Sequence, residues 1–81
     1  MQLKIKLFAM MRELQETDEI AVDISPGQTV GELREVIASH YPRLAPLLPA
    51  ARLAASLKFV PDDYRLSQLE EVALVPPVSG G

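Results

Sequence analysis

Two stretches of alternating apolar and polar residues constrain the fold of this chain most. Over residues 2–8, Leu3, Ile5 and Leu7 alternate with polar side chains, and residues 19–24 repeat the pattern. A period of two places the apolar side chains of a strand on one face of a sheet. The polar stretch 13–18 provides a connection, so we expect the two strands to pair as an antiparallel hairpin. The chain therefore begins with a sheet whose apolar face needs a cover.

A helix is predicted to supply that cover. Thr29 and Glu32 fit the Thr-x-x-Glu capping box, in which side chains satisfy the free N–H groups of a helix start. Apolar residues then recur at spacings of three and four, as a helix packed on a sheet requires: Val30, Leu33, Val36 or Ile37, and Tyr41. Pro42 ends the helix, and two further prolines limit the next segment to a short turn or a single helical turn. The leucines of that segment are expected to plug the open edge of the core: Leu44, Leu47 and Leu48.

The last third of the chain is predicted to complete the sheet. Residues 53–60 indicate a third strand, and residues 64–66 a short edge strand. The third strand should direct these side chains inwards: Leu57 and either Phe59 or Val60. The continuously apolar run 72–75 indicates a central strand, covered on both faces or covered by the helix on one face and a partner on the other. The order β-β-α-β-β-β predicts an α+β fold of the β-grasp class, a mixed sheet with one main helix packed on it and the final strand beside the first.

Composition excludes several classes of function. Of the 81 residues, 48% are apolar and 23% are charged, which indicates one ordered domain. The absence of cysteine excludes disulfides, thiol nucleophiles and thiolate metal ligands. His40 is the single histidine and is expected at the helix end, so we predict no metal site. A net charge of −3 with scattered basic residues argues against a nucleic-acid partner.

Other signals are missing as well. No apolar stretch approaches the roughly 20 residues of a membrane span, and the N-terminus lacks the apolar region of a signal peptide. We therefore expect a cytoplasmic protein without a membrane partner. No serine has a base at an interpretable spacing, and no glycine-rich phosphate loop occurs. An autonomous active site is not expected.

The C-terminus carries the strongest functional signal. The chain ends in Ser79, Gly80 and Gly81, and glycine lacks a Cβ, so another protein can thread this end into a narrow site. Four residues follow Pro77, and at about 3.3–3.6 Å per extended residue they reach about 13–14 Å. We expect a β-grasp domain at residues 1–77 and a flexible, reactive tail at residues 78–81. An inert, frayed terminus is the alternative.

An exposed apolar patch is predicted beside the root of this tail, because Phe8 and the end of the apolar final strand should lie close together. The expected partner interface consists of these residues: Phe8, Val75, Pro76 and Pro77. The alternative is that Phe8 and Val75 are ordinary core residues.

Two segments carry the motifs of a known family. Residues 7–14 read Leu-Phe-Ala-Met-Met-Arg-Glu-Leu, and residues 71–81 read Glu-Val-Ala-Leu-Val-Pro-Pro-Val-Ser-Gly-Gly. These segments resemble the opening and closing segments of the small, sulfur-carrying subunit of molybdopterin synthase, a ubiquitin-like family. Residues 40–44 and the total length also agree, so the resemblance covers the whole chain.

The resemblance implies a chemical role for the tail. An E1-like adenylating enzyme would use ATP to convert the carboxylate of Gly81 to a glycyl adenylate, and a sulfurtransferase donor would supply the sulfur of a thiocarboxylate. The preceding residues would insert into the large synthase subunit, within a heterotetramer: Val78, Ser79 and Gly80. There the sulfur passes to precursor Z, a cyclic pterin, to form the dithiolene of molybdopterin. The chain would be a non-catalytic subunit without a permanently bound cofactor, since the catalytic side chains belong to the large subunit.

Two other classes of function fit the same sequence. Another ubiquitin-like sulfur carrier or a protein modifier would also use an activated Gly81, the modifier to form isopeptide bonds with lysines of target proteins. A pure interaction domain would carry an inert tail, and an activating enzyme would ignore it.

Overall fold

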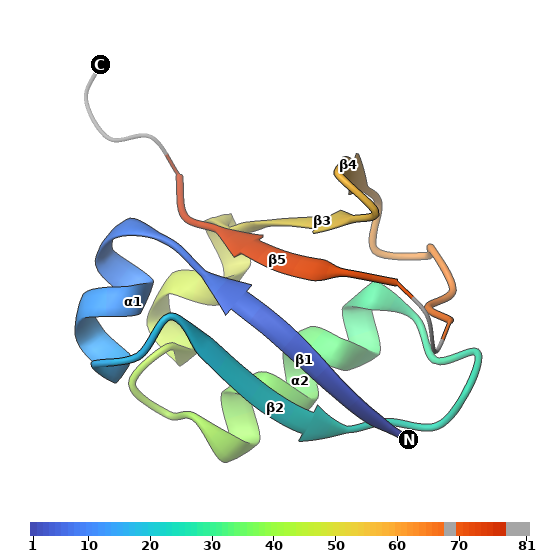
Figure 1. Ribbon diagram of the computed structural model, residues 1–81, viewed down its shortest axis with the longest axis horizontal. Coiled ribbons are helices and arrows are strands. Elements are labelled where there is room, and N and C mark those ends of the chain that lie inside the picture. The colour runs from blue at the N-terminus through green and yellow to red at the C-terminus, as the bar shows by residue number, and fades with distance from the viewer. Residues whose placement is uncertain (68–69, 78–81) are drawn as a thin grey trace.

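The fold is a single mixed sheet with one main helix across one face (Figure 1). The computed structural model describes residues 1–67 and 70–77. Five strands lie in the order β2-β1-β5-β3-β4. The elements are β1 (Gln2–Leu7), α1 (Ala9–Gln15), β2 (Glu19–Asp23), α2 (Val30–His40), the 3-10 helix η1 (Ala45–Ala50), β3 (Arg52–Ala55), β4 (Lys58–Val60) and β5 (Val72–Val75).

The predicted N-terminal hairpin and the central position of the last strand are confirmed. β1 pairs antiparallel with β2, with Leu3 opposite Val22. β5 lies between β1, to which it is parallel, and β3, to which it is antiparallel. Every second side chain of β1 and β5 is buried on the helix side of the sheet. This is the predicted β-grasp arrangement, with the final strand beside the first.

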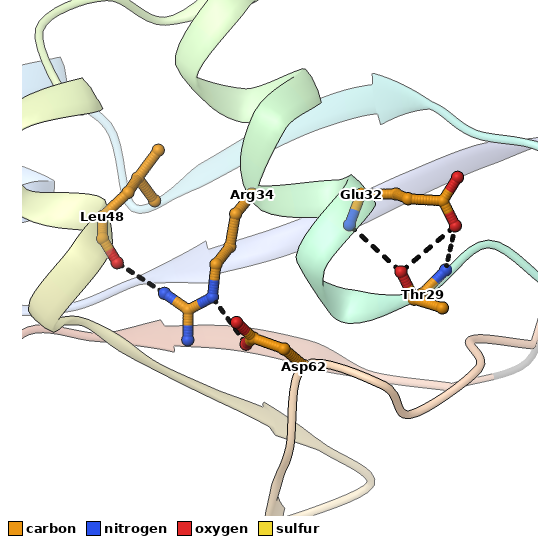
Figure 2. A network of polar contacts seen from close by, with 5 residues as sticks. All are labelled: Thr29, Glu32, Arg34, Leu48 and Asp62. Atoms are coloured by element: carbon orange, nitrogen blue, oxygen red, sulfur yellow. Dashed lines mark hydrogen bonds and ion pairs between the residues drawn. The ribbon is translucent and has the colours of Figure 1, made fainter.

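Helix α2 begins where the capping box predicts. The N–H of Glu32 donates to Oγ1 of Thr29 at 3.2 Å, and the N–H of Thr29 donates to Oε1 of Glu32 at 3.0 Å (Figure 2). The hydrogen bonds from the Thr29 backbone and hydroxyl lower the pKa of the Glu32 carboxyl. At the other end, the hydroxyl of Tyr41 donates to the carbonyl of Ala21 in β2 at 2.9 Å. The helix buries its predicted apolar residues against the sheet: Val30, Leu33 and Ile37.

Replacing Thr29 with alanine should lower the free energy of unfolding by about 1 kcal/mol, because the helix start loses its side-chain acceptor. Thr29→Ser keeps the hydroxyl and is the matched control, with a smaller expected change. Urea unfolding of the three proteins measures the difference. Equal stabilities of the alanine and serine variants would show that the cap contributes nothing.

A second polar cluster ties α2 to the segments that close the core. Nε of Arg34 donates to Oδ1 of Asp62 at 2.9 Å, and the same guanidinium donates through Nη1 to the carbonyl of Leu48 in η1 (Figure 2). Leu48 and Leu44 are buried and Leu47 is partly buried, so the predicted leucine plug is confirmed. The proline-rich segment forms a 3-10 helix of 6 residues, longer than the predicted single helical turn, and Arg34 fixes it to α2.

Residues 53–60 form a tight hairpin, so the prediction of one continuous strand is wrong. Ala55 lies opposite Lys58, and Ser56 and Leu57 between them have φ angles of +52° and +70°. Such two-residue turns favour Asn-Gly or Asp-Gly, so neither residue signals the turn in the sequence. Leu57, predicted to be interior, is 90% exposed. Phe59 is also exposed, whereas the alternative Val60 packs against the core.

Two further local predictions need correction. The expected edge strand at 64–66 is reduced to a single bridge between Arg65 and Thr29. The connection between the first two strands contains α1, a helix that the sequence did not indicate. Only Met11 of α1 is buried, and the helix spans seven residues, so no apolar stripe with helical spacing marks it.

Candidate functional site

The chain leaves the sheet from its centre. β1 and β5 run parallel and end side by side, with Leu7 opposite Leu74, so Phe8 follows beside Val75 (Figure 1). On the other flank of β5, Arg52 lies opposite Val75. The root of the tail, where the chain leaves β5 after Val75, is therefore flanked by the end of β1 on one side and by the start of β3 on the other.

The structure brings the predicted interface residues together, with one correction. Phe8 is 44% exposed, which excludes its alternative assignment to the core. Val75 is half-buried and Pro77 is exposed. Pro76 is buried within the chain, because it continues the inward alternation of Val72 and Leu74, so it offers little surface to a partner. The predicted tail residues lie outside the described part of the chain: Val78, Ser79, Gly80 and Gly81.

The exposed apolar surface extends further than the sequence predicted. On the sheet face opposite α2, Ala73, Ala54 and Phe59 lie side by side on β5, β3 and β4. We call the following set the outer apolar patch: Phe8, Ala54, Leu57, Phe59, Ala73 and Val75. Its hairpin members could be found only by recognising the turn at Ser56 and Leu57. No residue type there indicates positive φ.

One basic side chain borders this patch. The guanidinium of Arg52 lies over the ring of Phe59, 3.7 Å from its centroid. This cation–π contact restrains both side chains at the margin of the outer apolar patch. Because Arg52 also faces Val75, a charged group stands directly beside the root of the tail.

The turn in the β3–β4 hairpin is held at a cost, because a residue with a Cβ loses about 1–2 kcal/mol in the left-handed conformation. Replacing Ser56 with Asn and Leu57 with Gly should therefore raise the free energy of unfolding by about 1–2 kcal/mol. Leu57→Ala keeps the left-handed conformation and is the control without an expected gain. Urea unfolding distinguishes the three proteins, and an Asn-Gly variant no more stable than the control would contradict the prediction.

The loop that enters β5 is anchored by Glu70. The hydroxyl of Tyr64 donates to Oε2 of Glu70 at 2.7 Å, and the N–H of Ser67 donates to Oε1 at 2.9 Å. Burial raises the pKa of the Glu70 carboxyl, but these hydrogen bonds outweigh it and leave the pKa lowered. The same hydrogen bond to Glu70 raises the pKa of the Tyr64 hydroxyl. Glu70 is thus an ionised structural anchor.

Residues 1–67 and 70–77 contain neither a membrane-spanning helix nor a cluster of metal ligands. No helix there is long and apolar enough to cross a bilayer. Nor do three or more His, Asp or Glu side chains of these residues gather in a way that could hold a metal ion.

The whole chain matches known proteins. The model of the ThiS family matches residues 5–81. The chain belongs to the ThiS family. This ThiS-family chain is 39% identical to the molybdopterin synthase sulfur carrier subunit of Escherichia coli (strain K12), with 98% of this chain and 99% of the relative covered. The predicted family is therefore confirmed.

Solved structures share the fold of this ThiS-family chain. The crystal structure of SAMP1 from Haloferax volcanii superposes with a TM-score of 0.84 at 24% identity, and all of both chains is covered. A protein–protein complex of subunits 1 and 2 of molybdopterin-converting factor from Helicobacter pylori 26695 contains a chain with a TM-score of 0.70 at 21% identity, again over all of both chains. At these identities the likeness shows the fold alone, and it confirms the predicted ubiquitin-like β-grasp.

Proposed function

We propose that this protein is the sulfur carrier subunit of a molybdopterin synthase. The observation that carries the proposal is the full-length match at 39% identity to a relative with that name. The ending of the chain supports it, because Gly80 and Gly81 follow the central strand through a proline pair. A glycine carboxylate at that position has no side chain beside it to obstruct its chemistry.

The chemistry uses the carboxyl carbon of Gly81. An E1-like enzyme transfers the AMP group of ATP to the carboxylate and releases pyrophosphate. A sulfurtransferase donor then supplies sulfur at the sulfide level, formally HS⁻, which attacks the acyl carbon, releases AMP and leaves a thiocarboxylate on Gly81. Inside the large subunit this sulfur forms a bond to a carbon of precursor Z, which loses an oxygen as water. A water molecule hydrolyses the acyl–sulfur bond, so that Gly81 returns to the carboxylate form. Because the first step consumes ATP, we place the reaction in the cytoplasm.

Docking of the whole domain accompanies this transfer. The four residues after Pro77 reach about 13–14 Å when extended, so the domain has to lie against the partner for Gly81 to enter a buried site. Phe8, exposed beside the tail root, is suited to that contact. The Helicobacter pylori structure is a complex of subunits 1 and 2, which supports a large subunit as the partner. We place both subunits in a heterotetramer.

Reconstitution from purified components tests the proposal. The protein is combined with the adenylating enzyme, ATP, a sulfur donor, the large subunit and precursor Z. Molybdopterin should form only when every component is present, and pyrophosphate should be released in the first step. Failure of the enzyme to adenylate Gly81 would overturn the proposal. Isopeptide conjugates with lysines in place of molybdopterin would assign the protein to the modifiers.

A further inference from the structure

A hollow of about 140 Å³ lies on the outer apolar patch. Two small residues line it, Ala54 and Ala73, which lie directly opposite each other on β3 and β5. Phe8 and Leu57 also line it, and both are exposed, so taller apolar groups flank the two alanines. The hollow exists because two small side chains meet in the middle of a sheet face.

This arrangement is unfavourable within the chain itself. Leu57 is 90% exposed and has a left-handed backbone, so it gains little from burial while it bears strain. Alanine is also a weaker strand residue than the β-branched and aromatic types that commonly fill the middle of a sheet. The stability of the isolated domain therefore does not explain why two alanines form the base of the hollow or why Leu57 is exposed. A surface complementary to another protein explains both.

Both the place and the size of the hollow indicate its occupant. Ala73 lies two residues before Val75 on the same sheet face, about 7 Å along the strand, so a protein that covers the tail root also reaches the hollow. An apolar cavity of about 150 Å³ accepts a benzene ring in another protein. The hollow therefore has room for one leucine, methionine or phenylalanine side chain. Lys6 and Glu71 add charged groups to its lining, as in interfaces that have an apolar centre and a polar rim.

We infer that this hollow is a socket for one apolar side chain of the protein that receives the tail. The inference rests on the proposed function, which makes that protein the large synthase subunit. It differs from general apolar adhesion, because a socket is blocked by added apolar volume, whereas an adhesive surface is strengthened by it.

Filling the socket provides the test. Ala73→Leu and Ala54→Leu each place extra volume on its floor, and each should weaken binding to the purified large subunit at least about tenfold by calorimetry. Ala21→Leu makes the same change on β2, opposite Lys4 and away from the socket, and should bind like the wild type. Leucine is well tolerated in strands, and thermal unfolding verifies that each variant is folded.

The possible outcomes separate the inference from the proposed function. Undiminished binding by the filled variants, while the wild type binds, would overturn the socket and leave the carrier function standing. A wild type that does not bind the large subunit would count against the proposed function and remove the inference with it. Should Ala73→Leu fail to fold, Ala54→Leu decides alone. Wild-type self-association in sedimentation that Ala73→Leu abolishes would assign the socket to a second copy and overturn the inference.

Discussion

Adding one residue after Gly81 should abolish molybdopterin formation. The extension moves the terminal carboxylate about 3.3–3.6 Å beyond the position that faces the α-phosphate of ATP. A displacement of about 1 Å can already reduce catalysis about a hundredfold, so adenylation of the displaced terminal carboxylate should fall at least that far. ATP–pyrophosphate exchange with the adenylating enzyme measures this step directly.

Gly80→Ala is the companion variant, because it retains the terminal carboxylate and adds a Cβ where the walls of a partner tunnel should be close. It should also lose sulfur transfer. Thermal stability should not change for either variant, since the buried hydrophobic core of the part of the chain that the structure describes lies between Leu3 and Leu74. Full synthase activity from a protein that still carries the extra residue would show that the diglycine is an inert terminus without a role in sulfur transfer.

The second large effect is expected at Phe8. Replacing Phe8 with Asp should weaken binding to the large subunit by more than about 2 kcal/mol, because a buried aromatic anchor would be exchanged for a charge. The fold should persist, since Phe8 is already 44% exposed in the free protein. Titration calorimetry with the large subunit measures the change.

Leu14 supplies the matched control for Phe8. It is 41% exposed but lies on α1, outside the outer apolar patch, so Leu14→Asp should bind the large subunit like the wild type. Unchanged affinity of a folded Phe8→Asp variant would remove Phe8 from the interface. An equal loss in both variants would indicate general charge repulsion in place of a specific contact.

Much of the fold could be predicted wherever burial follows a simple period. The capping box at Thr29 located the start of α2, and the alternation of β1 and β2 identified their buried faces. Prediction failed at Ser56 and Leu57, because neither residue type favours the positive φ angle that it adopts. The turn is evident only from the pairing of β3 with β4. Helix α1 was missed for a related reason, since most of its side chains face solvent.

Some features of the candidate site could likewise be predicted from the sequence, and others could not. The chemistry proposed for Gly81 is what the family resemblance of the terminal segment implies, and that resemblance needs no knowledge of the fold. The position of Phe8 beside Val75 followed from placing the last strand next to the first. The meeting of Ala54 with Ala73 could not be predicted, because it depends on the register between two strands that are distant in the sequence.

The state of the Gly81 carboxyl group is the most direct test of the carrier function. The full chain can be purified from cells that retain the adenylating enzyme and the sulfur donor but lack the large subunit, so that the thiocarboxylate form accumulates, and its intact mass can be measured. We expect a mass increase equal to the exchange of one oxygen for one sulfur, located on Gly81 and lost when the large subunit and precursor Z are added. A chain that carries only a carboxylate under these conditions would rule out the carrier function.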